Sequence, residues 1–100
     1  MTSSSFISAK DVISPKAHWS LIDVVADLGP DNIAVAVGRW DGNPVLAMRW
    51  NGGAANRLGN PQSRGLPTWF VLPAGPYTEA IIALVPAEKQ ALVRNFIPAS

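Results

Sequence analysis

Apolar and polar positions alternate most regularly between residues 33 and 50, on both sides of Asp41-Gly42-Asn43-Pro44. Bulky and small side chains alternate from Ile33 to Trp40, and an apolar run returns from Val45 to Trp50. A period of two is typical of a β-strand, and Asp-Gly is among the strongest short signals for a hairpin turn. The pattern therefore predicts a β-hairpin over residues 32–52, with strands Ile33–Trp40 and Val45–Trp50 and the four-residue turn 41–44.

A less regular form of this pattern precedes the hairpin. The stretch Trp19–Leu28 contains β-branched residues in partial alternation with polar ones, which predicts a third strand. The segment Gly29-Pro30-Asp31-Asn32 is a strong turn signal between this strand and the hairpin. Residues 1–16 are polar and serine-rich, so we expect a frayed, flexible terminus or a short strand over Phe6–Ser8, followed by a turn.

The second half of the chain changes character. Residues 51–67 are rich in glycine, proline and asparagine, which predicts a long irregular loop of the kind that often carries function. An apolar strand follows over Thr68–Leu72, ended by Pro73, and a helix opens near Pro76 and continues to residue 85. After Pro86, the stretch Ala87–Phe96 has helical spacing. The predicted fold is α+β: a four-stranded antiparallel meander followed by a C-terminal helix or helices, in one domain of residues 1–100.

The two faces of the predicted hairpin differ in side-chain size. If Trp40 lies opposite Val45, one face carries the bulky residues Ile33, Val35, Val37, Leu46, Met48 and Trp50. We expect this face to be core. The other face carries Ala34, Ala36, Gly38 and Ala47, with Trp40 and Arg49 standing on it. Small residues allow a helix or a dimer partner to approach closely, while Trp40 and Arg49 are suited either to base stacking or to a purely structural contact.

The composition of the chain limits the cellular compartment and the kinds of site that we expect. Of the 100 residues, 48% are hydrophobic, and there is no cysteine, which excludes disulfides and thiolate metal sites and favours a reducing cytoplasm. The first residues lack the basic and apolar regions of a signal peptide, and no run approaches the roughly 18 apolar residues of a membrane helix. A chain this short gains stability from dimerisation, so we expect a homodimer.

Charge is unevenly distributed. Residues 1–41 carry three basic and five acidic residues, and residues 79–100 are balanced. Residues 42–78 carry Arg49, Arg57 and Arg64 and no acidic residue. Arginine is suited to phosphate forks and to stacking on bases, although three arginines on loops are also ordinary solubilising charge.

The sequence contains no recognisable catalytic motif and no metal-binding motif. The one histidine, His18, lies beside Trp19 with no nucleophile at a recognisable spacing, and the scattered aspartates give no metal-ligand spacing. Gly52-Gly53 lacks the Lys-Ser/Thr that a phosphate-binding loop needs. We expect no enzyme, no metal and no cofactor.

One family resemblance follows from these residues. The order of elements and the hairpin resemble the transcriptional coactivator family typified by human positive cofactor four, especially its bacterial single-stranded-DNA-binding relatives. The similarity covers about residues 32–85: Trp40-Asp41-Gly42-Asn43-Pro44 leads to Met48-Arg49-Trp50, as in the family's turn and following strand, and Arg64-Gly65 stands where the family has Lys-Gly. The resemblance implies a dimer that grips single strands with its sheet.

The chain departs from that family in three respects. Its loop 51–67 is longer, the family's lysine-rich character is missing, and Pro86 and residues 87–100 have no counterpart.

Two hypotheses for function remain open. The first is a small homodimeric protein that binds single-stranded DNA or RNA, such as a transcription accessory factor. Its binding residues would be exposed and clustered, and they are Arg39, Trp40, Arg49, Arg57, Gln62 and Arg64. The second is a protein-interaction module, such as an inhibitor or adaptor encoded by a mobile element, which docks a partner through the small-residue face and the loop 51–67. The near-zero net charge of +1 favours the second, since strong nucleic-acid binders are usually more basic.

Overall fold

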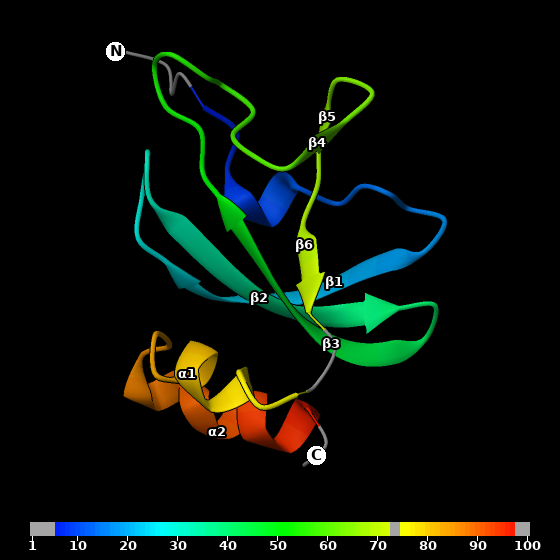
Figure 1. Ribbon diagram of the computed structural model, residues 1–100, viewed down its shortest axis with the longest axis vertical. Coiled ribbons are helices and arrows are strands. Elements are labelled where there is room, and N and C mark those ends of the chain that lie inside the picture. The colour runs from blue at the N-terminus through cyan, green and yellow to red at the C-terminus, as the bar shows by residue number, and fades with distance from the viewer. Residues whose placement is uncertain (1–5, 73–74, 98–100) are drawn as a thin grey trace.

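Figure 1 shows a computed structural model of the chain, which describes residues 6–72 and 75–97. A four-stranded antiparallel sheet of order β1-β2-β3-β6 is followed by two helices, which confirms the α+β fold. The sheet consists of β1 (Trp19–Asp27), β2 (Ile33–Trp40), β3 (Asn43–Trp50) and β6 (Phe70–Leu72). The remaining elements are the 3₁₀ helix η1 (Ala9–Asp11), a small hairpin of β4 (Gln62–Ser63) and β5 (Leu66–Pro67), and the helices α1 (Thr78–Ile82) and α2 (Ala87–Phe96).

The predicted hairpin is present, but its turn is shorter than expected. Trp40 pairs with Asn43, so the turn contains only Asp41 and Gly42, with φ of 50° and 86°. Two positive φ values in a two-residue loop match the twist of the flanking strands, which is why Asp-Gly is favoured there. The predicted pairing of Trp40 with Val45 is therefore wrong by two residues. A shift of two leaves every side chain on its expected face, because side chains alternate with period two.

The boundaries of other predicted elements also differ from those in the structure. The strand predicted over Trp19–Leu28 is confirmed as β1, whereas no strand forms over Phe6–Ser8, where the Ile7 amide instead donates to the Arg57 carbonyl at 3.0 Å. The loop 51–67 is not irregular throughout, since the β4–β5 hairpin closes its end. The strand predicted over Thr68–Leu72 shortens to β6.

Three of the sequence expectations lie partly or wholly outside the described residues. They are the flexible part of the terminus at residues 1–5, the strand-ending Pro73, and the end of the chain at 98–100.

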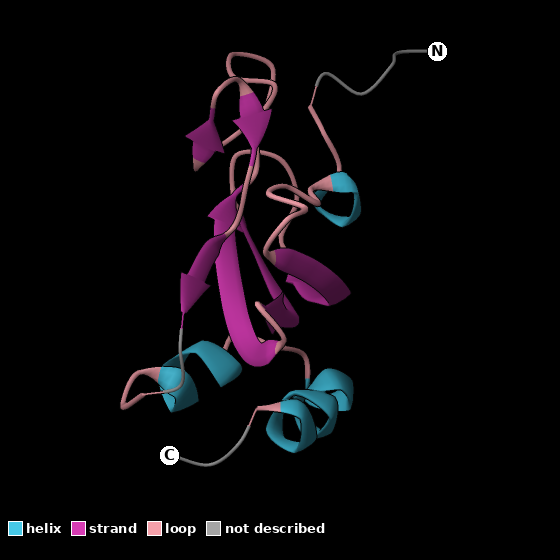
Figure 2. Cartoon of the chain, turned by 90° about the vertical axis from the view of Figure 1, so that its right-hand side faces the viewer, coloured by secondary structure: helices cyan, strands magenta, loops and turns pink. Residues whose placement is uncertain are grey.

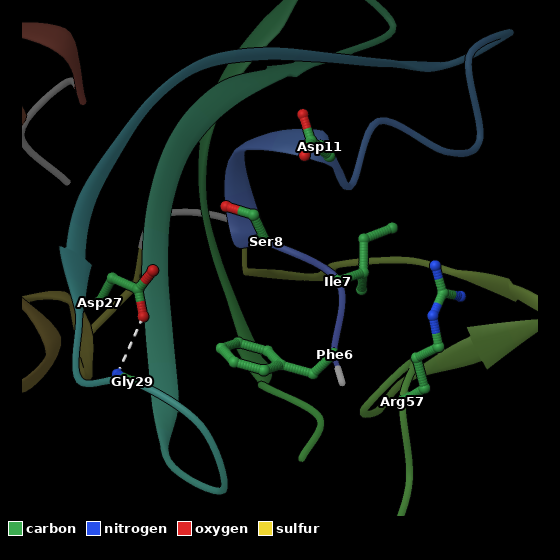
Figure 3. Close-up of a pocket in the computed structure, with 7 residues that line it drawn as sticks. All are labelled: Phe6, Ile7, Ser8, Asp11, Asp27, Gly29 and Arg57. Atoms are coloured by element: carbon green, nitrogen blue, oxygen red, sulfur yellow. Dashed lines mark hydrogen bonds between the residues drawn. The ribbon is translucent and has the colours of Figure 1, made fainter. Parts of the chain in front are cut away.

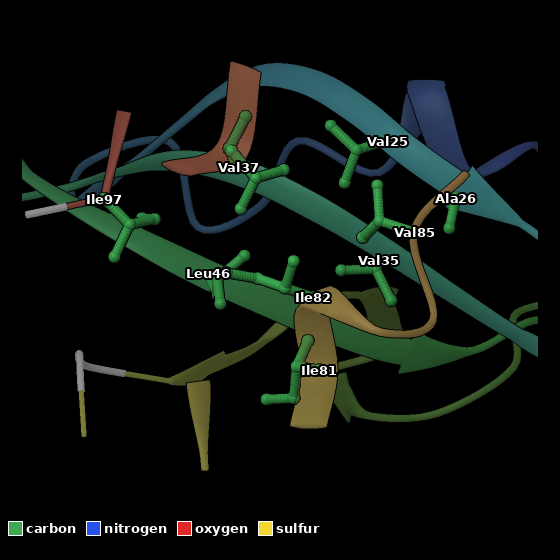
Figure 4. Close-up of a cluster of buried hydrophobic side chains, with 10 residues drawn as sticks. Val25, Ala26, Val35, Val37, Leu46, Ile81, Ile82, Val85 and Ile97 are labelled. Carbon is green, nitrogen blue, oxygen red and sulfur yellow. The ribbon is translucent and has the colours of Figure 1, made fainter. Parts of the chain in front are cut away.

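One face of the sheet packs against α1 and α2, and we call it the helix-covered face. Figure 4 shows its core, in which the strand residues Val25, Ala26, Val35, Val37 and Leu46 meet Ile81, Ile82, Val85, Val93 and Ile97. Lys89 of α2 adds an ion pair to Asp23 of β1, at 2.8 Å. The expectation that the bulky face is core is correct for Val35, Val37 and Leu46. It is wrong for Trp50, which remains 48% exposed because the helices do not reach that end of the sheet.

The opposite face, here the small-residue face, is covered by the chain itself. Ala34, Ala36 and Ala47 are fully buried beneath η1 and two tryptophans, in a cluster completed by Ala9, Val12, Trp19, Val45 and Trp69. A Cβ at Gly38 would overlap the Trp19 ring, which explains why a glycine stands there. The Trp69 indole N–H donates to the Val12 carbonyl at 2.6 Å and fixes the covering segment. The short helix η1 and the two tryptophans of the same chain fill this space, so the close approach expected of a helix or a dimer partner is made here by the chain's own N-terminal segment and the tryptophans.

Within the described parts of the chain, neither α1 nor α2 has the length and apolar character that crossing a bilayer demands.

Candidate nucleic-acid interface

The arginines expected to cluster lie in separate places. Arg39 is exposed and lies over the Phe96 ring, 5.1 Å from its centroid, on the helix-covered face. Arg57 and Arg64 are exposed and line different grooves. The predicted convergence of the basic middle third on one surface is therefore not found.

Arg49 is buried, which makes its predicted exposure wrong. Its residue is only 3% exposed, and burial lowers the pKa of its guanidinium. Nη1 donates to the Thr68 carbonyl at 2.6 Å, and Nη2 donates to the Leu58 carbonyl. The side chain thus ties the loop 51–67 to the sheet, because a buried guanidinium needs acceptors and loop carbonyls supply them.

Arg57 lines a groove of mixed charge. Figure 3 shows this groove of about 550 Å³, lined by Phe6, Ile7, Ser8, Asp11, Asp27, Gly29 and Arg57. The Asp27 carboxylate accepts hydrogen bonds from the Gly29 amide at 3.0 Å and from the Asn51 side chain at 2.9 Å. Two carboxylates offset one guanidinium here, so the groove does not favour a polyanion.

Arg64 lines a groove of a different kind, which we call the basic groove. It has a volume of about 710 Å³ and is lined by Ser14, Pro15, Lys16, Ala17, His18, Ser63, Arg64, Leu66 and Thr68. Lys16 and Arg64 are both exposed, and none of these nine lining residues is acidic. A parallel bridge between Ser14 and Thr68 joins its two walls. The fold thus places cations from two distant segments around one open space.

Two stacked rings stand beside the basic groove. The His18 and Trp40 rings stack with centroids 5.2 Å apart and planes 23° apart. The His18 Nδ1 is 2.7 Å from the Asp41 Oδ1, which fixes the orientation of the imidazole. Since His18 covers Trp40 and its own side chain is 52% exposed, the ring open to a stacking ligand is that of His18.

The side chain of Gln62, the remaining predicted site residue, forms hydrogen bonds within its own loop. Its amide Nε2 donates to the Gly59 carbonyl at 2.8 Å and lies 3.3 Å from the Asn56 Oδ1. Sequence reasoning missed Lys16 and His18 as groove residues, because tertiary contacts such as the Ser14–Thr68 bridge and the Trp69–Val12 hydrogen bond bring their segment to that of Arg64. No local pattern in the sequence signals that bridge.

A second exposed feature is apolar, and we call it the aromatic patch. It consists of Trp50 and Phe70 with Ile33, Met48 and Pro61, which line a hollow of about 410 Å³ together with Arg49 and Asn60. Trp50 is 48% exposed and Phe70 is 62% exposed. Met48 pairs with Phe70, and Ile33 with Trp50, so all four side chains lie on the uncovered end of the helix-covered face.

Comparison of the chain with protein-family models, with curated proteins and with solved structures gives no match. The resemblance to the positive cofactor four family therefore stays a prediction. Among residues 6–72 and 75–97, no three His, Asp or Glu side chains come together as a metal site would require.

Proposed function

We propose that this chain is a small single-stranded nucleic-acid-binding protein, which holds its ligand in the basic groove rather than on the sheet. The observation that carries the proposal is the meeting of Lys16 and Arg64 around one groove without an acidic lining residue. Cations that neutralise phosphates supply most of the affinity of a protein for nucleic acid.

The other lining groups suit the same ligand. Ser14, Ser63 and Thr68 line the groove, and hydroxyl side chains are common neutral donors to phosphate oxygens. The His18 ring, stacked on Trp40 and held by Asp41, offers a base a flat surface, and stacking tolerates any base. The expected ligand is therefore a single strand bound with little sequence preference.

Fluorescence anisotropy with a labelled oligothymidine at low salt tests this proposal. The double variant Lys16→Ala/Arg64→Ala removes both cations of the groove, and we expect its affinity to fall at least tenfold. The slope of log affinity against log salt concentration should fall by about 1.4, since each phosphate contact to a single strand contributes about 0.7.

A matched control is available in the same chain. The variant Arg39→Ala/Arg57→Ala removes two exposed arginines that lie outside the basic groove, and it lowers net charge by the same amount. Its affinity and salt slope should stay close to those of the wild type. The proposal is wrong if the wild type does not bind at low salt, or if the control loses as much affinity as the groove variant.

The other function expected from the sequence, a protein-interaction module, cannot dock its partner through the small-residue face, because the chain itself buries that face, but a separate observation favours such a module. The aromatic patch exposes two large rings on one face, and contiguous exposed apolar surface often marks a site of association. The patch shares no lining residue with the basic groove, so the two functions are compatible in one molecule.

A further inference from the structure

His18 and Asp41 form a pair that the fold brings together from positions 23 residues apart. The His18 Nδ1 lies 2.7 Å from the Asp41 Oδ1, and the Asp41 backbone amide donates to the His18 carbonyl at 2.8 Å. In Figure 1 the segment that leads into β1 and the turn between β2 and β3 lie on the same side of the molecule, which faces the viewer in Figure 2. The two contacts fix both the position and the orientation of the imidazole.

This pair determines which ring nitrogen of His18 is available for chemistry. An ionised carboxylate can only accept a hydrogen bond, so Asp41 holds the imidazole proton on Nδ1. The other nitrogen, Nε2, has no hydrogen-bond partner within residues 6–72 and 75–97. Because His18 lines the basic groove with half of its side chain exposed, Nε2 is accessible to a ligand there. An imidazole oriented by a carboxylate in this way is equipped to act as a general base.

The cations of the basic groove complement such a base. Lys16 and Arg64 line the same groove as His18, and none of the lining residues is acidic. When a phosphodiester is attacked, negative charge develops on the phosphate oxygens, and fixed positive groups stabilise that charge. The groove thus places a base and two cations around one space, which is what the cleavage of a phosphodiester requires.

The nucleophile for this reaction can come from the ligand itself. Each nucleotide of RNA carries a 2′-hydroxyl beside its own phosphodiester, and DNA lacks this group. A base that removes the 2′ proton therefore allows the strand to cleave itself, without a serine or cysteine nucleophile. Stacking uses the flat face of the His18 ring and proton transfer uses its edge, so the two roles do not compete.

We propose that the basic groove cleaves single-stranded RNA with His18 as the general base, an inference that rests on the proposed function. Nε2 removes the proton of a 2′-hydroxyl, and the 2′ oxygen forms a bond to the adjacent phosphorus. The bond from phosphorus to the next 5′ oxygen breaks. That oxygen takes a proton from the Lys16 ammonium, since an ammonium, unlike a guanidinium, can release one. His18 then loses its proton to solvent and Lys16 regains one.

The products of this step are a 2′,3′-cyclic phosphate on one fragment and a 5′-hydroxyl on the other. Asp41 does not touch the ligand in this scheme. It is a positioning residue, which holds the imidazole in the correct tautomer and stabilises the imidazolium that forms.

Single-turnover cleavage of a labelled oligouridine, with the chain in excess and EDTA present, tests the proposal. The wild type should produce fragments that end in a 2′,3′-cyclic phosphate, which mass spectrometry identifies. Oligothymidine and 2′-O-methyl oligouridine should bind and stay intact, because neither offers a free 2′-hydroxyl.

His18→Phe keeps a flat ring beside Trp40 but removes the base. The cleavage rate at saturating chain concentration should fall by about a hundredfold or more, the usual contribution of general acid–base catalysis. Measuring at saturation separates this loss of chemistry from any change in affinity.

Asp41→Asn tests the positioning role, because asparagine tolerates the positive φ of this turn position and removes only the charge. The saturated rate should fall by about tenfold or more, while the chain concentration that gives half of that rate stays unchanged. A merely structural role would not produce this split. Asp11→Asn is the matched control: it removes an exposed carboxylate outside the basic groove and should cleave as the wild type does.

The outcomes distinguish this inference from the proposed function. If the wild type binds oligothymidine and oligouridine but leaves oligouridine intact, the cleavage proposal is wrong and the proposed function stands. Equal cleavage by His18→Phe and the wild type also overturns it, because the activity then does not depend on the imidazole. Failure of the wild type to bind either oligonucleotide overturns both proposals.

Discussion

The two faces of the sheet are both covered by apolar side chains, but the strand residues and the residues that cover them differ in size between the two faces. On the helix-covered face, branched side chains such as Val35, Val37 and Leu46 project far from the strands and meet the aliphatic side chains of α1 and α2. On the small-residue face, Ala34, Ala36 and Gly38 project little, so Trp19 and Trp69 reach down to them. The size of the strand side chains thus determines how large the side chains that cover them are, because protein interiors pack to a nearly constant density.

Truncating the helix-covered face should have the largest effect. Leu46 is 1% exposed and touches the core beneath the helices. Leu46→Ala should lower the free energy of unfolding by about 3 kcal/mol, since it removes apolar contacts and leaves a cavity. Urea denaturation measures this loss. The same substitution at the exposed Leu28 should change stability by less than about 0.5 kcal/mol, and similar losses at both sites would contradict the assignment of the core.

An intermediate effect is expected on the small-residue face, at Arg49. Arg49→Met keeps the buried stem but leaves the Thr68 and Leu58 carbonyls without their charged donor. We expect a loss of about 2 kcal/mol in urea denaturation, with unchanged oligothymidine affinity below the unfolding transition. Arg57→Met, at an exposed arginine, is the control and should be nearly neutral in stability. A specific loss of oligothymidine affinity in Arg49→Met would instead show that Arg49 belongs to the ligand site.

The smallest effect should come from a single hydrogen bond of the same face. Trp69→Phe keeps an aromatic ring but removes the donor to the Val12 carbonyl. The free energy of unfolding should fall by about 1 kcal/mol, read from the midpoint of urea denaturation. Trp50→Phe makes the same change at a half-exposed ring and should cost less. If the two variants cost the same, the indole N–H of Trp69 does not anchor the cover.

Much of the fold could be predicted because it follows from local patterns of residues along the chain. The alternation from Ile33 to Trp40 and the Asp41-Gly42 turn define the hairpin, and the division into a bulky and a small-residue face survived a register error of two residues. Pro86 separates the two helices as expected. What covers the small-residue face was not predictable, because the short N-terminal segment around η1 has no periodicity that marks it as a cover for alanines.

The candidate site was harder to predict for a related reason. Arg49 was expected at the surface because its residue type suits phosphate, but whether an arginine is exposed depends on where loop carbonyls come to lie. Lys16 and Arg64 belong to different segments, and contacts such as the bridge between Ser14 and Thr68 bring them to one groove. Contacts of that kind arise from tertiary packing, which a pattern of neighbours along the chain does not encode.

The order in which the two covers occur along the chain has a consequence during synthesis. The small-residue face takes its cover from η1, Trp19 and Trp69, all of which precede α1 and α2 along the chain, whereas the helix-covered face waits for α1 and α2, which follow the sheet. A nascent chain that has emerged only as far as β6 therefore has one finished face and one bare face of valine and leucine. A chain at that stage exposes this apolar surface until α1 and α2 are made, and transiently exposed apolar surface promotes aggregation.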